Sequence, residues 1–255
     1  MTPRILIIAG SDSGGGAGVQ ADIKTVTMLG GHAMTAITAI TAQNTLGVQA
    51  VLPVPAGMVV AQINSVVTDI GVDAVKIGMI GSAGTANAVA DVLEHIDVPI
   101  VLDPVMVATS GDVLADADTI AAFERLMKLA TVTTPNLPEL AALGGRDAVL
   151  AHGCHLLEKG GHAEGERIVD ELYAPGGRLR QWEAKRFDTT DTHGTGCTLS
   201  SAIAAGLGGG MTVEDAVERA IRFVRIAILS APRLGGGHGP MGHALGVVPF
   251  DEIEG

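Results

Sequence analysis

The stretch Asp191-Thr192-His193-Gly194-Thr195-Gly196-Cys197-Thr198 places a glycine-rich loop directly before an apolar pattern. Leu199, Ile203 and Leu207 follow at helical spacing, so the stretch predicts a loop that ends at a helix N-terminus. Such an end offers unpaired backbone N–H groups and a partial positive charge, which together can hold an anion. The glycines would let the backbone approach that anion closely.

Cys197 would lie in the first turn of this helix. The positive field at a helix start lowers the pKa of a thiol, so we expect Cys197 to be a thiolate beside an anion hole made by Gly194, Thr195 and Gly196. A thiolate there could take a proton from a hydroxyl group while a phosphoryl group is transferred. The alternative is a structural glycine turn followed by a buried cysteine, and these eight residues alone do not separate the two.

Composition narrows the class of protein. The chain has 255 residues, a hydrophobic content of 47% and a formal net charge of −12, which disfavours non-specific binding to nucleic acid or to anionic membranes. The longest apolar stretch, residues 50–61, is interrupted by Pro53 and Pro55, so no segment predicts a membrane span. Cys154 and Cys197 do not make a disulfide framework. We expect a cytoplasmic protein without nucleic-acid or membrane partners.

Apolar runs alternate with helical patterns along the whole chain. Strands are expected at 5–9, 36–41, 74–77, 98–102, 130–134, 167–173 and 178–186, and residues 156–162 are expected to be a further strand end with a glycine turn. Helices are expected at 19–29, 58–67, 85–95, 118–129, 199–207 and 213–228. Since no linker or composition break divides residues 1–255, the pattern predicts a single α/β domain with a mostly parallel sheet covered by helices on both faces.

Several polar residues stand where α/β proteins bind ligands. The glycine-rich loop 10–18 follows the first strand, although its spacing fits neither a Walker loop nor a dinucleotide fingerprint. Asp22 could face back into the site or could simply complement the helix dipole. The amide of Gln43 could pair with the edge of an aminopyrimidine, or Gln43 could be a turn residue.

Other candidates follow the later strands. Lys76 lies in an apolar strand and should be paired with a carboxylate or a phosphate, because a lone buried lysine is costly. Asp103 ends a buried strand, which is a common place for chemistry. Asn136 and Glu139 have the spacing of a helix capping box, and they could instead lie near a magnesium–phosphate cluster through ordered water.

Seven motifs are present together in one order. They are Ala9-Gly10-Ser11-Asp12 with Gln20-Ala21-Asp22, Gln43-Asn44-Thr45, Lys76-Ile77-Gly78-Met79, Asp103-Pro104-Val105, Thr134-Pro135-Asn136 with Glu139, Lys159-Gly160-Gly161-His162, and the segment 192–198. The set resembles the hydroxymethylpyrimidine/phosphomethylpyrimidine kinases of thiamine biosynthesis, in the ribokinase-like superfamily. The resemblance covers nearly the whole chain.

The resemblance implies a three-layer α/β/α ribokinase-like fold, ATP with Mg²⁺, and phosphorylation of the hydroxymethyl group of an aminopyrimidine and then of the resulting monophosphate. Superfamily members are often dimers, so a homodimer is expected. The positions that match pyrimidine contacts are Gly10, Asp22, Gln43, Met79 and Val105. Those that match the nucleotide, phosphate and Mg²⁺ region are Asp103, Asn136, Glu139, Lys159 and Thr192, with Mg²⁺ reached from Asn136 and Glu139 through water. The anion hole matches Gly194–Gly196.

Cys197, which belongs to the family motif, stands where ribokinase relatives usually carry an aspartate base. The chain departs from the family pattern at two places: Gly14 stands where serine is often found, and Asp191 stands where asparagine is frequent. Two other functions stay open at this point. One is a pyridoxal kinase, which shares the fold and can share the Gly-x-Gly-Cys ending, and the other is a non-catalytic pyrimidine-binding protein.

Overall fold

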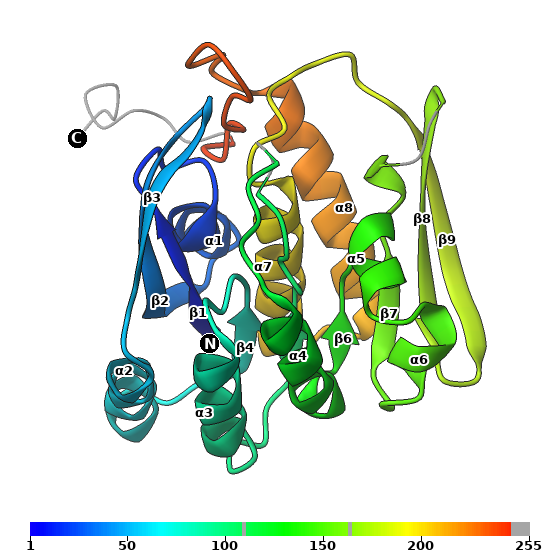
Figure 1. Cartoon of the computed structure of the whole chain (residues 1–255). Helices are drawn as coiled ribbons and strands as arrows, with labels where there is room; N and C mark the ends of the chain where they lie inside the picture. The colour runs from blue at the N-terminus through cyan, green and yellow to red at the C-terminus, as the bar shows by residue number, and fades with distance from the viewer. Residues whose placement is uncertain (109–110, 163–164, 246–255) are drawn as a thin grey trace.

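A computed structural model describes residues 1–108, 111–162 and 165–245 of the chain. Their strands form one nine-stranded sheet in the order β3-β2-β1-β4-β5-β6-β7-β8-β9 (Figure 1). The strands are β1 (Arg4–Asp12), β2 (His32–Asn44), β3 (Gly47–Pro53), β4 (Ala74–Ile77), β5 (Ile100–Leu102), β6 (Val132–Thr133), β7 (His155–Glu158), β8 (Arg167–Ala174) and β9 (Gly177–Lys185). The six neighbouring strands β2, β1, β4, β5, β6 and β7 are paired in parallel, whereas β3, β8 and β9 join antiparallel at the two edges.

Helices cover both faces of this sheet (Figure 1). One face carries α1 (Gly18–Met28), α7 (Thr195–Gly208) and α8 (Val213–Leu229). The other carries α2 (Ala56–Asp69), α3 (Ala83–Leu93), α4 (Ala117–Leu129), α5 (Leu137–Ala142) and α6 (Arg146–Leu150). The arrangement is the predicted three-layer α/β/α fold. Within the described residues, no helix is both long enough and apolar enough to cross a membrane.

Strand β1 shows why the apolar runs of the sequence become central strands. Leu6 and Ile8 pack into the core on one face of the sheet, and Ile5 and Ile7 pack into the core on the other. All four side chains are fully buried, and each contributes about 1.5–3 kcal/mol through burial. A continuous apolar run, rather than an alternating one, is therefore what this position requires.

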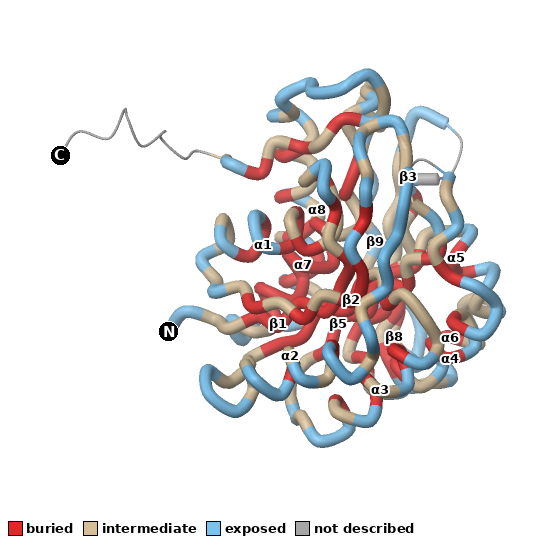
Figure 2. Tube along the Cα trace, turned by 60° about the vertical axis from the view of Figure 1, so that its left-hand side comes forward, coloured by how far each residue is buried: buried red, intermediate tan, exposed pale blue. Residues whose placement is uncertain are grey.

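Three elements differ most from the expectation, and the first is α6 (Arg146–Leu150), which was not predicted. Strand β2 runs over His32–Asn44, well beyond the predicted 36–41, and β3 was not predicted at all. Most of β3 is exposed, as Figure 2 shows, so its sequence has no buried face to produce a recognisable pattern. The strands expected at 167–173 and 178–186 are confirmed as β8 and β9, which pair antiparallel as a hairpin.

The parallel strands determine where a site can form. Their carboxyl ends meet at one edge of the sheet, and the chain leaves this edge through the loop after β1, Met79 after β4, Asp103 after β5, and Lys159 after β7. The N-terminus of α7 reaches the same edge, since a side chain on Gly196 would approach both Asp103 and Lys159. Segments far apart in sequence are thus gathered at one place, as α/β topology requires.

Candidate active site

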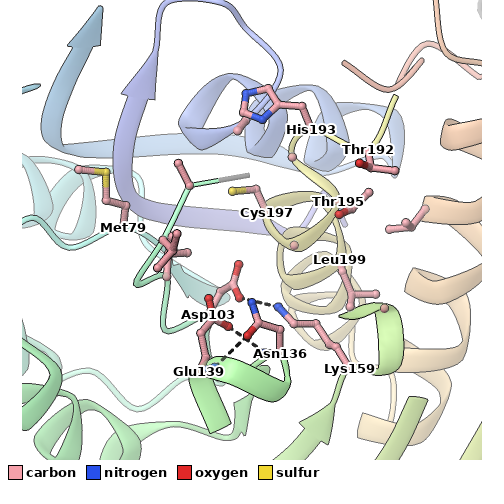
Figure 3. A pocket seen from close by; sticks show the side chains of 18 of the residues that line it. Met79, Asp103, Asn136, Glu139, Lys159, Thr192, His193, Thr195, Cys197 and Leu199 are labelled. Atoms are coloured by element: carbon pink, nitrogen blue, oxygen red, sulfur yellow. Dashed lines mark hydrogen bonds and ion pairs between the residues drawn. The ribbon is translucent and has the colours of Figure 1, made fainter. Parts of the chain in front are cut away.

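A cavity of about 980 Å³ opens at this edge of the sheet. Its volume is at the upper end of the range for small-molecule sites. Of the predicted site residues, its wall includes Gly10, Gln43, Met79, Asp103, Val105, Asn136, Glu139, Lys159, Thr192, Gly194, Thr195, Gly196 and Cys197. In Figure 3, Cys197 lies at the start of α7, with His193 above it, Met79 to its left, and Asp103 and Lys159 below it.

The start of α7 requires its glycines. Gly194 has a φ of +84°, in the left-handed region, and a Cβ there would overlap the carbonyl oxygen of Gly16. A Cβ on Gly196 would lie 3.3 Å from Asp103 Oδ2 and 3.4 Å from Lys159 Nζ. The first amides of α7 therefore face the cavity next to a lysine ammonium, which is a suitable place for an anion.

Asp103 and Lys159 form a buried ion pair on this wall, with 3.0 Å between Lys159 Nζ and Asp103 Oδ1. Burial alone would lower the pKa of Lys159. The negative charges of Asp103 and Glu139 raise it by more than burial lowers it, so the pKa is above its ordinary value. Lys159 thus remains positively charged inside the cavity.

Asn136 and Glu139 form the predicted capping box of α5. The Glu139 N–H donates to Asn136 Oδ1 at 2.9 Å, and the Asn136 N–H donates to Glu139 Oε2 at 2.8 Å (Figure 3). Burial raises the pKa of Glu139, against the opposing charge of Lys159. The two residues cap the helix and border the cavity at once, so their structural and functional interpretations are compatible. Among the described residues, no group of three or more His, Cys, Asp or Glu side chains could hold a metal ion.

The ionisation of Cys197 differs from the prediction. Burial raises the pKa of its thiol to about 11, although the Lys76 ammonium and the Gly18 backbone N–H act in the opposite direction. The expectation of a thiolate is therefore wrong, because near pH 7 the sulfur keeps its proton. The helix start is present, but desolvation outweighs its effect.

Of the predicted site residues, Asp22 alone does not line the cavity. Its side chain is fully buried, and its Oδ2 lies 2.8 Å from Lys76 Nζ. Ser201 Oγ donates to Asp22 Oδ1 at 2.7 Å. Asp22 therefore lies behind the wall, where it faces Lys76 and not the space that a ring would occupy. The prediction that a carboxylate or phosphate neutralises Lys76 is confirmed.

Comparison with known proteins identifies the family of this chain. The family model described as phosphomethylpyrimidine kinase matches residues 12–242. The chain belongs to the phosphomethylpyrimidine kinase family. A hydroxymethylpyrimidine/phosphomethylpyrimidine kinase of Rhizobium meliloti (strain 1021) is 48% identical, with 95% of this chain and 97% of the relative covered. One of the same name from Streptomyces coelicolor is 46% identical, with 96% of both chains covered.

Solved structures agree with this membership. An ADP complex of Bacillus subtilis pyridoxal kinase matches with a TM-score of 0.87 and 33% identity, over 96% of this chain and 98% of that one. A phosphomethylpyrimidine kinase of Clostridium difficile 630 matches with a TM-score of 0.74 and 36% identity, over 89% of this chain and 100% of that one. The predicted family resemblance and ribokinase-like fold are confirmed.

In this phosphomethylpyrimidine kinase family member, Asp12 and His193 join the first loop to the loop before α7. His193 Nε2 lies 2.9 Å from Asp12 Oδ2, and the same carboxylate accepts N–H groups from Gly14, Gly16 and Ala17. Burial raises the pKa of Asp12, but the hydrogen bonds from His193 and the loop amides outweigh it and lower the pKa overall. Sequence reasoning assigned neither residue a role, because 181 positions separate them.

The wall around Gln43 is narrow and polar. Gln43 Oε1 accepts from Thr41 Oγ1 at 3.1 Å, and Gln43 Nε2 lies 3.4 Å from His193 Nε2. A Cβ on Gly10 would lie 3.0 Å from Met79 Sδ, so any larger residue would require the methionine side chain to shift. This part of the cavity combines the amide of Gln43 with the apolar side chain of Met79.

The opposite end of the cavity is mainly apolar, although Asp170, Arg186 and Arg225 also border it. Its lining includes Trp182, Phe187, Ile221, Val224 and Ile228. Trp182 is the only tryptophan in the chain, and its indole N–H is buried with no hydrogen-bond partner among the described residues. Such a surface suits a planar aromatic ligand.

The segment Gly237–Pro240 supports the site from outside. It does not line the cavity. The His238 N–H donates to the Thr45 carbonyl at 2.9 Å, and the His193 N–H donates to the Gly239 carbonyl at 3.1 Å. The segment therefore connects the end of β2 to the loop before α7. Gly14 and Asp191, the two departures from the family pattern, also lie outside the described cavity wall.

Proposed function

We propose that this protein is an ATP-dependent kinase of thiamine biosynthesis. It phosphorylates the hydroxymethyl group of 4-amino-5-hydroxymethyl-2-methylpyrimidine, and then phosphorylates the monophosphate to the diphosphate. One observation carries the proposal: a single cavity joins the wall around Gln43 and Met79 to the α7 start and Lys159, with Cys197 between them.

The end of the cavity near Gln43 would bind the pyrimidine. An aminopyrimidine edge presents a ring acceptor beside an amino donor, and a glutamine amide offers the complementary pair. Met79 and Val105 border the same space and would contact the ring faces. We assign Asp22 no direct contact with the ring, because its carboxylate is fully buried against Lys76.

The middle and far parts of the cavity would bind ATP. The apolar lining around Trp182 would hold the base, and the α7 amides of Gly194–Gly196 and Lys159 would hold the phosphates, with Thr192 on the same wall. Phosphoryl transfer depends mainly on positioning and on stabilisation of charge, and fixed amides and an ammonium provide both.

Mg²⁺ fits the donors near α5. Mg²⁺ usually keeps several waters and binds through substrate phosphates and one or two carboxylates. Asn136 Oδ1 and Glu139 Oε2 already accept the capping hydrogen bonds, which favours contact through water over direct ligation. Bound there with ATP, the ion would neutralise charge on the phosphates.

Cys197 would act as the proton acceptor of the first transfer. The hydroxymethyl O–H bond breaks as an Sγ–H bond forms, while the oxygen bonds to the γ-phosphorus and the bond from that phosphorus to the ADP oxygen breaks. Because the pKa of the thiol is about 11, only the minor deprotonated form can do this near pH 7. The second transfer starts from a phosphate oxygen that is already anionic, so it needs no base.

The test is a side-by-side assay of purified protein with ATP, Mg²⁺ and either hydroxymethylpyrimidine or pyridoxal. We expect mono- and diphosphate products of the pyrimidine, identified by mass spectrometry and dependent on ATP. A preference for pyridoxal would favour the second candidate function, which the high TM-score to pyridoxal kinases supports. Binding without any phosphorylated product would indicate a non-catalytic protein.

We also infer that the protein is a homodimer. The β2–β3 edge exposes large apolar side chains, with Ile40 50%, Leu46 72% and Leu52 64% accessible. A patch of that kind on a sheet edge commonly marks an interface. Light scattering after gel filtration should give the mass of two chains, and Leu46→Glu with Leu52→Glu should reduce it to one. A monomeric wild type would refute the inference.

A further inference from the structure

A buried ion pair lies behind the cavity wall without an evident structural reason. Lys76 and Asp22 side chains are both 0% exposed, and 2.8 Å separates Lys76 Nζ from Asp22 Oδ2. Removing two charges from water is costly, and apolar residues in the same place are often at least as stabilising. The pair therefore needs an explanation beyond stability.

The geometry places this pair beneath Cys197. Cys197 and Ser201 are four residues apart on α7 and so share one face of the helix. Ser201 Oγ donates to Asp22 Oδ1 at 2.7 Å, and Asp22 holds Lys76. A Cβ on Gly78 would lie 2.7 Å from Lys76 Nζ, so the glycine after β4 leaves space for the ammonium.

The charges around the Cys197 sulfur come from several elements. Lys76 on β4 is the strongest charged influence, and it lowers the pKa of the thiol, while Asp22 on α1 and Asp103 after β5 raise it. Lys159 after β7 is also close enough to interact electrostatically with Cys197. The influence is mutual, because Cys197 helps to raise the pKa of Lys76.

We propose that Lys76 is a positioning residue for the first phosphoryl transfer: its ammonium, held by Asp22 beneath the start of α7, stabilises the negative charge that the Cys197 sulfur must carry before it accepts the hydroxymethyl proton. Lys76 keeps its own protons throughout, and the proton that first leaves Cys197 passes to water. The electrostatic part of the inference concerns the free protein, and only its kinetic consequence rests on the proposed kinase function.

The test measures alkylation of Cys197 by iodoacetamide as a function of pH, without substrates, by peptide mass spectrometry. Asp22→Asn is compared with Asp22→Asn plus Lys76→Met, because both proteins are neutral at position 22 and differ only in the ammonium. Lys76 should stay charged in the single variant, since Asp103 and Cys197 also stabilise its protonated form. We expect the alkylation midpoint of Asp22→Asn to lie about one pH unit or more below that of the double variant. At a fixed pH below both midpoints, Asp22→Asn should therefore be alkylated about tenfold faster.

Ser201→Ala is the matched control, because it breaks the same network without changing a charge. Its alkylation midpoint should stay close to that of the wild type, and circular dichroism checks that every variant is folded. Equal midpoints in the Asp22→Asn pair, or an equally large shift in Ser201→Ala, would overturn the role of Lys76.

A kinetic measurement separates this inference from the proposed function. The rise of kcat/KM with pH for the hydroxymethyl substrate should move in the same direction as the alkylation midpoint, because both report the ionisation of the free protein. If the alkylation midpoint differs between the two variants but the pH profile of an active enzyme does not, Lys76 controls the ionisation of Cys197 but is not a positioning residue for the transfer. If no variant or wild type phosphorylates the pyrimidine, the proposed function fails, while the alkylation result still decides the electrostatic claim.

Discussion

Replacing Cys197 should affect the two phosphorylation steps unequally. Its thiol has a pKa of about 11. Near pH 8 only about one molecule in 10³ is therefore ionised, since each pH unit below the pKa is tenfold. If that form is the base, kcat/KM for the hydroxymethyl substrate should rise about tenfold per pH unit from about pH 7 to about pH 10.

The variant Cys197→Ala should lose on the order of 10²-fold or more in the first step, the usual contribution of a general base, and its pH profile should become flat. Cys197→Ser is the matched control, because a hydroxyl keeps the shape of the site but does not ionise in this range. It should behave like the alanine variant. The second step should change only by about threefold or less, because its phosphate nucleophile has a pKa near 6.

The assay follows each step from its own substrate, with a coupled measurement of ADP release between about pH 7 and about pH 10. Near wild-type turnover in the first step for either variant would remove Cys197 from the role of base. Equal losses in both steps would also refute the reasoning, because they would show that the residue positions the phosphoryl group.

Three further predictions concern other parts of the site. Gln43→Ala should raise KM for the pyrimidine far more than KM for ATP in steady-state kinetics, and equal changes would argue against a ring contact. Asn136→Ala removes one half of the α5 capping box and should lower the free energy of unfolding by about 1 kcal/mol in urea titrations, so an unchanged value would show that the cap contributes nothing. Burial, and then Lys24, lower the pKa of His243 from 6.5 to about 4. This residue therefore contributes at most about 3 kcal/mol of stability. The contribution is complete above about pH 6.5, the ordinary pKa of histidine, and is lost as the pH falls through about 4, the pKa in the folded protein. His243→Gln, which can still accept from Thr198, should therefore lose less stability than the wild type between about pH 7 and about pH 4.5.

Local sequence patterns were sufficient for the layers of the fold but not for its edges. The apolar run of β1 identifies a strand that is buried on both faces, and Gly194 and Gly196 mark the start of α7. Strand β3 escaped prediction because it is largely exposed and pairs only along one edge of the sheet. A pattern of burial cannot identify an element that buries little.

The site was predictable as a set of residues but not as a set of interactions. Lys76 required an anionic partner, yet only the fold shows that the partner is Asp22, 54 positions earlier. Asp12 and His193 meet across a still longer separation. Cys197 has the helix start that suggested a thiolate, but its pKa depends on desolvation and on charges from α1, β4 and β5, which no local motif contains.

The solitary indole of Trp182 gives the protein an intrinsic optical reporter. Excitation of tryptophan would produce emission from this one side chain, which borders the apolar end of the cavity. A nucleotide that settles there would displace water from the accessible part of the ring, and so alter both the intensity and the colour of the emitted light. Occupancy of one end of the cavity can thus be followed in real time, without a label and without turnover.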